Sequence, residues 1–373
     1  MTERLKPLDG IRVLDFTAFP PGGACTVLLA DLGAEVIRVE SPAAKGKPSL
    51  VVGQMAMSRG KRSIALDMRN PASSEILLRL APTIDVVVEN AKPGAMESRG
   101  FGYRQAREAN PGLIWCAITG FGQEGPYSGH AGHDISYVAH SGLLSALSAE
   151  PWEPGLSLSL QAGALSSVIA IQAALLQRAK TGEGAFIDLS LSEAAGWFLT
   201  CGINPLTDHA LIMPATADRR LYACADGRFV AVACAEPRTW GALCDSLGVP
   251  ELKPNLHQRD VADETTEKLA AIFLTAAAAE WVERLTPSGA AVAIVNHASQ
   301  LLDDPHVQAR GSVVEAGGVP VVRSPVRVTA PGGAVTGTAT DAPHAIGDDT
   351  GDVLASAGFS VDEINALAVR ELI

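Results

Sequence analysis

Short apolar runs, each bounded by turn residues or charges, recur along the first half of the chain. This pattern is typical of buried strands in a parallel sheet. We therefore predict strands at 10–16, 34–39, 84–89, 113–118 and 185–189. Helical stretches such as 24–32 and 75–80 lie between them. Strands that alternate with helices predict an α/β fold with a parallel sheet, which binds ligands at the carboxyl ends of its strands.

The second half of the chain shows a change of organisation. A long helix is predicted over 155–180, ended by Thr181-Gly182-Glu183-Gly184, and another helix begins at Ser192. The segment 201–220 contains Pro205 and Pro214 and is predicted to be a linker. Short strands on either side of Asp226-Gly227 predict a β-hairpin. Further helices are expected at 236–247, 271–285 and 361–372. We predict a large α/β domain over 1–200 and a small α/β domain over 221–315.

One apolar segment is nearly long enough to cross a bilayer, because no charged residue lies between Gly155 and Leu176. It also contains Gln161, Gln172 and four serines, so a helix buried inside the protein is the favoured interpretation. The opening residues are charged and lack the apolar core of a secretory signal. We expect a soluble, cytoplasmic protein.

Composition and charge limit the class of protein further. A chain of 373 residues, of which 47% are hydrophobic, is long enough for one large or two medium domains. A formal net charge of −12 disfavours a nucleic acid as the partner. The six cysteines form no C-x-x-C pair, which argues against a disulfide framework or a zinc site and suits a reducing compartment. The chain has no G-x-G-x-x-G and no P-loop motif, which disfavours a dinucleotide dehydrogenase and an NTPase.

Basic residues cluster in one part of this acidic chain. The cluster comprises Arg38, Lys45, Lys47, Arg59, Lys61 and Arg62, and Lys92 follows further along. Such a cluster is either a solvated charged face or a site for an anionic ligand such as a pyrophosphate. The residues alone leave both interpretations open.

The most informative motif is Ala131-Gly132-His133-Asp134-Ile135-Ser136-Tyr137, which is followed by Ser159-Leu160-Gln161-Ala162-Gly163. The first segment resembles the active-site segment of the α-methylacyl-CoA racemases, which belong to the family III CoA-transferases (the CaiB/BaiF family). In that family the His-Asp segment is followed by a helix that opens with a carboxylate, in the pattern Asp-x-x-(Ala/Gly)-Gly. Here Ser159 occupies the carboxylate position.

The resemblance extends over almost the whole chain. It includes Leu8 to Asp15, Ala30 to Glu40, Asn90 to Gly94, Thr119 to Pro126, Asp226 to Val232 and Asp304 to Gly311. It implies a large Rossmann-like CoA-binding domain, a small α/β domain, a segment 316–373 that returns to the large domain, and two chains interlocked as a dimer. The implied substrate is a CoA thioester, with no metal, nicotinamide or flavin.

The resemblance also assigns roles to individual residues. The implied CoA contacts are Arg38, Arg59, Lys61, Arg62, Lys92 and Tyr137. The implied acid–base residue is His133. Asp134 is expected to orient the backbone or the histidine. It is not expected to replace the lost carboxylate, because it lies on a different element of the chain. Ser159 is expected to cap its helix, since a lone serine hydroxyl is a poor base and a poor nucleophile. Glu236 either supports His133 across the domain interface or caps the helix that follows it.

Three functions remain open from the sequence. The first is a CoA-transferase subunit whose partner chain carries the missing aspartate as nucleophile. The second is an α-methylacyl-CoA racemase or epimerase, in which His133 acts with an unidentified second group. The third is a non-catalytic protein that binds a CoA thioester. Small apolar residues near 133–163 and 190–215 suit a hydrophobic or branched acyl chain.

Overall fold

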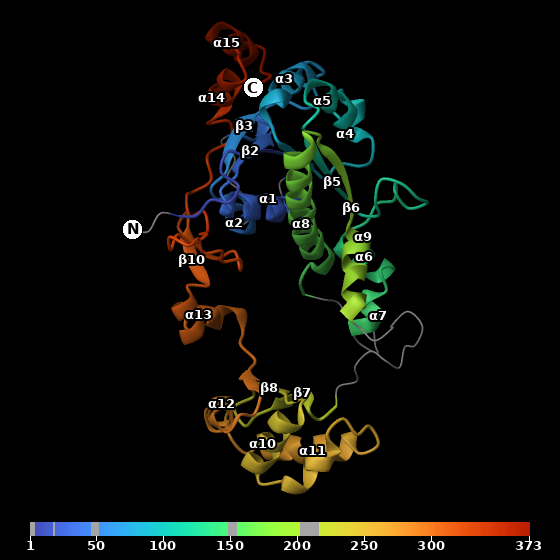
Figure 1. Ribbon diagram of the computed structural model, residues 1–373, viewed down its shortest axis with the longest axis vertical. Helices are drawn as coiled ribbons and strands as arrows, with labels where there is room; N and C mark the ends of the chain where they lie inside the picture. The colour runs from blue at the N-terminus through green and yellow to red at the C-terminus, as the bar shows by residue number, and fades with distance from the viewer. Residues whose placement is uncertain (1–3, 18, 46–51, 148–154, 202–215) are drawn as a thin grey trace. The chain divides into compact units, whose positions relative to one another are not determined.

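The computed structural model describes residues 4–17, 19–45, 52–147, 155–201 and 216–373 (Figure 1). The chain forms two compact units. The first comprises residues 1–201 together with 308–373, and the second comprises 202–307. The predicted linker 201–220 falls mostly on 202–215, outside the described residues.

The first unit is built on one parallel sheet. Its strands are β1 (Arg12–Asp15), β2 (Glu35–Glu40), β3 (Arg62–Ala65), β4 (Val86–Glu89), β5 (Ile114–Thr119) and β6 (Ala185–Ser190). They lie in the order β3-β2-β1-β4-β5-β6, and every pair is parallel. The prediction of an α/β fold with a parallel sheet is therefore confirmed. Strand β3 was missed, because Arg62-Ser63-Ile64-Ala65 follows a basic run and shows no long apolar stretch.

Strand order determines where this sheet can bind a ligand. The chain moves outward from β1 to β2 and β3, and then returns to place β4 on the other side of β1. The connections after β1 and β4 thus leave the sheet in opposite directions. A crevice opens at the carboxyl ends of the strands at such a switch point.

Helices cover both faces of the sheet. In chain order they are α1 (Gly22–Asp31), α2 (Val52–Ser58), α3 (Ala72–Leu80), α4 (Ala95–Ser98), α5 (Tyr103–Ala109), α6 (Asp134–His140), α7 (Leu143–Leu147), α8 (Leu158–Thr181), α9 (Leu191–Gly196), α13 (Pro305–Arg310, at the boundary of the units), α14 (Thr350–Ser356) and α15 (Val361–Val369). A small hairpin, β10 (Val313–Ala316) with β11 (Val319–Val322), lies in the C-terminal segment.

Alternation along the strands creates two cores. Leu14 and Ile37 belong to the core formed with α3, α5 and α14, whereas their neighbours Val13 and Val36 belong to the core formed with α1 and α8. Successive side chains of a strand point to opposite faces, so each strand contributes to both cores. Helices α1 and α8 lie side by side (Figure 1).

Helix α8 is, among the described residues, the one helix long and apolar enough to cross a membrane by length and composition. Only 33% of its most apolar 18-residue stretch is buried within the chain. Ala164 and Ile171 lie in the core, while Leu165 and Ile169 are 52% and 68% exposed. The prediction of a helix buried inside the protein therefore holds for one face of α8.

The second unit has its own sheet and core. Strands β7 (Arg219–Ala223), β8 (Phe229–Ala233) and β9 (Val292–Ile294) form an antiparallel sheet, packed with α10 (Pro237–Leu247), α11 (Ala262–Phe273) and α12 (Ala278–Leu285). The predicted hairpin is present, with Gly227 at φ +74° in its turn.

The single helix predicted over 271–285 is wrong, because the chain leaves the helical conformation between α11 and α12. Ala277 is extended, and the Ala276 carbonyl accepts a hydrogen bond from Ala225 N at 3.0 Å. Asp226 Oδ2 accepts a hydrogen bond from Ala278 N at 3.3 Å. Contacts with the hairpin turn thus replace intrahelical hydrogen bonds at a point that no local pattern reveals.

The Thr181-Gly182-Glu183-Gly184 turn yields a stability prediction. A Cβ on Gly184 would lie 2.0 Å from the Leu113 carbonyl oxygen, so Gly184→Ala forces β5 and β6 apart. We expect it to lower the free energy of unfolding by about 3 kcal/mol. Gly182→Ala is the matched control, since Gly182 has φ +77° with open space around it and the change should cost about 1 kcal/mol. Urea unfolding of both variants measures the difference, and equal losses would contradict the steric account.

Candidate active site

A crevice of about 340 Å³ lies at the carboxyl ends of β1, β4 and β5. Its described lining comprises Pro20, Pro21, Asn90, Ala91, Lys92, Pro93, Ile118, Thr119, Gly120, Ser128, His130, Ala131, Gly132, His133, Asp134, Tyr137, Leu160 and Leu191. The lining includes four residues that the sequence singled out, namely Lys92, His133, Asp134 and Tyr137. The crevice thus occupies the position that the strand order predicts for a ligand.

Packing around Tyr137 fixes the start of α6. A Cβ on Gly120 would lie 2.3 Å from the Tyr137 ring, and one on Gly132 would lie 2.6 Å from it. Both positions therefore require glycine. The ring also contacts Phe121 edge-on, with centroids 5.2 Å apart. This packing holds the turn that places His133, the exposed N-cap residue of α6, at the edge of the crevice.

Asp134 joins α6 to the first turn of α8. Its Oδ1 accepts hydrogen bonds from Ser159 Oγ at 2.6 Å and from Leu160 N at 3.1 Å. Its Oδ2 accepts a hydrogen bond from Leu158 N at 3.1 Å. Free N–H groups at a helix start and the helix dipole both favour an anion at this position.

This geometry corrects one expectation. Asp134 was expected to lie on the wrong element to replace the missing carboxylate, yet its side chain reaches the position of Ser159 from α6. Ser159 itself is fully buried and donates its hydroxyl hydrogen to Asp134. The helix N-cap is Ser157, so Ser159 does not cap α8 as expected. A carboxyl group therefore lies beside residue 159, although serine occupies that position.

Tyr137 keeps its proton in this environment. Burial raises the pKa of the Tyr137 phenol, and the nearby Asp134 carboxylate raises it further. A protonated phenol at the crevice wall is a hydrogen-bond donor over the whole physiological pH range.

Lys61 is part of the core of the first unit. Its side chain is 1% exposed, and its Nζ donates to Asp15 Oδ2 at 3.0 Å and to Thr26 Oγ1 at 2.6 Å. Burial lowers the pKa of Lys61, an effect that the Asp15 carboxylate opposes. These contacts fasten β3 to β1 and α1.

The three predicted arginines are also paired within the protein. Arg38 contacts Glu40 at 2.9 Å, Arg59 contacts Asp31 at 2.7 Å, and Arg62 contacts both Glu35 at 2.7 Å and Asp349 at 3.0 Å. None of the three lines the crevice as described. Lys92, by contrast, is an exposed residue of the crevice wall.

Glu236 lies at the N-cap of α10 in the second unit. Its side-chain Oε2 and its carbonyl oxygen each accept a hydrogen bond from Thr239 Oγ1 at 3.0 Å. Glu236 thus occupies the N-cap position, but its side chain accepts no hydrogen bond from the backbone N–H groups of the helix. Support of His133 by Glu236 stays a prediction.

Two histidines for which the sequence predicts no role lie near the site. His130 lines the crevice, and His140 Nδ1 lies 2.7 Å from Ser192 Oγ. The His140 ring is held edge-on between Phe121 and Tyr127, at centroid distances of 5.3 and 5.2 Å. In the sequence, Tyr137 and His140 are three residues apart, and on one helix this spacing indicates that the two side chains lie on the same face.

Glu89 is a further residue that the sequence patterns did not identify. It ends β4 and lines a smaller hollow of about 250 Å³ with Phe16, Met68 and Arg99. Burial raises the pKa of the Glu89 carboxyl to about 7, although its Oε2 accepts a hydrogen bond from Ala91 N at 2.6 Å. In the sequence, Glu89 is an acidic residue at the end of an otherwise apolar strand, and this position indicates a carboxyl group close to the ligand-binding edge of the sheet.

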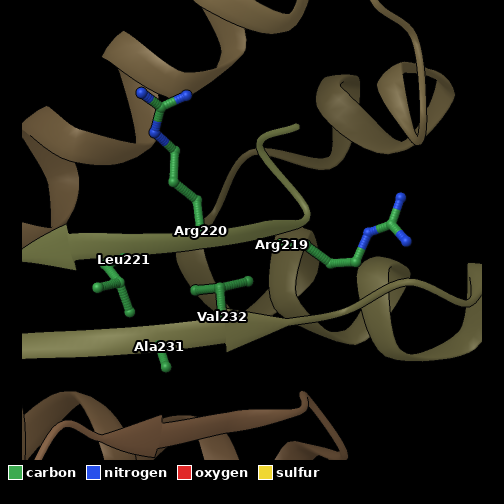
Figure 2. A pocket seen from close by; sticks show the side chains of 5 residues that line it. All are labelled: Arg219, Arg220, Leu221, Ala231 and Val232. Carbon is green, nitrogen blue, oxygen red and sulfur yellow. The ribbon is translucent and has the colours of Figure 1, made fainter. Parts of the chain in front are cut away.

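A larger hollow, of about 510 Å³, lies on the sheet of the second unit (Figure 2). It is lined by Arg219 and Arg220 together with Leu221, Ala231 and Val232 of β7 and β8. In Figure 2 the Arg220 and Leu221 side chains leave β7 on opposite sides, as successive residues of a strand do. Its described lining contains no side chain suited to proton transfer near neutral pH, so the crevice is the candidate active site.

The described residues contain no group of three or more His, Cys, Asp or Glu side chains placed to hold a metal ion. The ionisable groups of the described crevice lining are the imidazoles of His130 and His133, the Lys92 ammonium, the Asp134 carboxyl and the Tyr137 phenol.

Comparison with known proteins settles the family. Residues 8–350 match the sequence model of CoA-transferase family III. The chain belongs to CoA-transferase family III. Members of this family use CoA thioesters as substrates.

The relatives of this family III chain include both racemases and transferases. Human α-methylacyl-CoA racemase is 31% identical over 385 aligned residues, which cover 98% of this chain and 97% of the racemase. Human succinyl-CoA:glutarate CoA-transferase is 32% identical over 343 residues, which cover 83% of this chain and 76% of the transferase. The crystal structure of a CaiB/BaiF family protein from Brucella suis matches with a TM-score of 0.81 and 30% identity, over 95% of this chain and 100% of that one.

The Lys61–Asp15 pair yields a test of whether Lys61 is structural. Lys61→Met leaves the Asp15 carboxylate buried without its cation, and we expect it to lower the free energy of unfolding by about 3–5 kcal/mol. Lys92→Met removes an exposed lysine and should change stability by less than about 0.5 kcal/mol. Unfolding is measured without any CoA compound present. A Lys61→Met variant as stable as the wild type would show that the ion pair is dispensable.

Glu89 yields a pH-dependent test. A carboxyl group with a raised pKa stabilises the folded protein below its unfolded-state pKa, and this stability is lost as pH rises through the folded-state pKa of about 7. We expect Glu89→Gln to gain stability relative to the wild type, on the order of 3 kcal/mol, between pH 4.5 and pH 8. Urea unfolding across this range measures the gain. A constant difference between the two proteins would contradict the raised pKa.

Proposed function

We propose that this protein binds an acyl-CoA thioester in the crevice and transfers a proton at the α-carbon of its acyl group. His133 acts as one acid–base residue and Asp134 as the other. The observation that carries the proposal is the hydrogen bond of 2.6 Å between Ser159 Oγ and Asp134 Oδ1. It supports a carboxylate acting beside the position where the racemases of the family carry their aspartate.

The chemistry needs two groups with complementary protonation states. One group removes the α-proton, and the conjugate acid of the other returns a proton to the opposite face of the planar enolate, which inverts the carbon. His133 is exposed at the N-terminus of α6, and an imidazole can both accept and donate a proton. Asp134 Oδ2 accepts one hydrogen bond and retains a lone pair for a proton.

Substrate binding uses the wall of the crevice. Of the predicted CoA contacts, Lys92 and Tyr137 line it, and Lys92 supplies an exposed cation for a phosphate group. Ile118, Leu160 and Leu191 supply apolar surface for the acyl group. The volume of about 340 Å³ suits a compact acyl group.

A second candidate function is a subunit of a CoA-transferase. Asp134 is the one carboxylate in the described crevice lining, and its two oxygens already accept three hydrogen bonds. A transferase of this family needs a nucleophilic carboxylate. A partner chain with aspartate at the position of Ser159, interlocked with this chain as a dimer, would supply it.

Isotope exchange tests the proton-transfer proposal. The purified chain is incubated in D2O with a panel of 2-methylacyl-CoA and arylacyl-CoA thioesters, and the mass of each acyl group is followed. We expect a gain of one deuterium, slowed at least about 100-fold in His133→Asn because the removed imidazole is an acid–base catalyst. His306→Asn, which changes an exposed histidine outside the crevice lining, should exchange like the wild type.

Other outcomes point to other functions. Exchange that survives His133→Asn would contradict the role of His133. Absence of exchange with retained thioester binding would contradict proton transfer by the chain alone. Addition of a carboxylate-bearing partner chain would then distinguish a transferase subunit, which gains CoA transfer, from a non-catalytic binder, which does not.

A further inference from the structure

Thr119 carries a buried hydroxyl that has no hydrogen-bond partner in the protein. Thr119 is the last residue of β5, is 6% exposed, and lines the crevice. Among the described buried side-chain atoms that lack a partner, Thr119 Oγ1 is the one whose residue belongs to the crevice wall. A buried polar atom left without a partner costs about 1–3 kcal/mol, so its presence needs an explanation.

Neighbouring polar groups are already engaged. Ser190 pairs with Thr119 in the register of β5 and β6, but its hydroxyl oxygen accepts a hydrogen bond from Glu193 N at 3.3 Å. Asp188, on the same strand as Ser190, accepts the hydrogen bond of Gln123 N at 3.1 Å. Valine would fill the position with the same shape and the same preference for a strand. The hydroxyl is thus not explained by packing.

The Tyr137 hydroxyl lies close to the same segment. A Cβ on Gly120, the residue after Thr119, would lie 2.8 Å from Tyr137 Oη. Thr119 and Tyr137 both line the crevice. The Tyr137 phenol remains protonated because burial raises its pKa. Two residues that carry neutral hydroxyl groups therefore line the crevice near the carboxyl end of β5.

We propose that the Thr119 hydroxyl donates a hydrogen bond to the thioester carbonyl oxygen of the bound acyl-CoA. This inference rests on the proposed function. A neutral hydroxyl among Ile118, Leu160 and Leu191 suits a carbonyl oxygen better than a phosphate, which is recognised by cations such as Lys92. The ligand therefore supplies the partner that the protein does not.

The contact gains strength during the reaction. When a base removes the α-proton, the C–H electron pair forms a double bond between the α-carbon and the carbonyl carbon. The carbonyl π pair moves onto oxygen, which becomes an enolate oxygen. A hydroxyl fixed at that oxygen stabilises the developing charge, and reprotonation of the α-carbon reverses each movement.

Thr119→Val tests the inference, because it removes the hydroxyl and keeps the shape. We expect exchange into the acyl group to fall roughly a hundredfold, as the loss of one oxyanion donor does in other enzymes. Binding of an acyl-CoA thioester should weaken, whereas binding of free CoA, which has no thioester carbonyl, should be unchanged. The unliganded variant should be at least as stable as the wild type, since a partnerless hydroxyl has been removed. Thr119→Ser, which keeps a hydroxyl, should retain most of the exchange.

Three results would overturn the inference. Wild-type exchange in Thr119→Val would make the hydroxyl a packing feature. A loss of unliganded stability in Thr119→Val would indicate a partner for the hydroxyl within the protein. Equal weakening of thioester and free CoA binding would place the contact away from the carbonyl. Failure of the wild type to exchange would count against proton transfer, and the difference between thioester and free CoA binding would still decide the role of Thr119.

Discussion

The candidate site depends on the hydrogen bonds that Asp134 receives at the start of α8. They join α6, which opens with the His-Asp motif, to the longest helix of the first unit, which packs on the sheet. A carboxylate is suited to this position because the first N–H groups of a helix have no partners inside the helix. The same side chain therefore holds the two helices together and places a carboxyl group at the crevice wall.

Local patterns were enough to predict the framework but not every element. Apolar runs such as Val86 to Glu89 identified the buried strands, and Asp226-Gly227 identified the hairpin. Strand β3 was missed because a short strand with only Ile64 and Ala65 as apolar residues has no signal of its own. The break between α11 and α12 was missed because its cause is a contact with a turn about fifty residues earlier in the chain.

In the candidate site, too, features that depend on adjacent residues were predicted, and features that depend on contacts between distant residues were missed. The Gly-His-Asp motif located His133 and Asp134, since both follow from residue types at adjacent positions. The partner of Asp134 lies 25 residues away on another helix, and that distance hid the contact with Ser159. The basic cluster shows how distant partners escape local patterns. The resemblance implies CoA contacts for its arginines and Lys61, which stay a prediction, while the carboxylates that pair with them in the structure come from as far as Asp349.

Serine at position 159 leaves Asp134 as the carboxyl group of the described crevice lining. An aspartate there would lie beside Asp134, and two carboxylates at hydrogen-bond distance cannot both be ionised, so they would share a proton. Serine instead donates its own hydroxyl hydrogen to Asp134 Oδ1, so no second carboxyl group competes for a proton at the start of α8. The described crevice lining thus contains one carboxyl group, fixed by hydrogen bonds from α8. Such a carboxyl group suits proton transfer, which leaves its hydrogen bonds in place, better than formation of an acyl anhydride, which needs one of its oxygens to bond covalently to the acyl carbon.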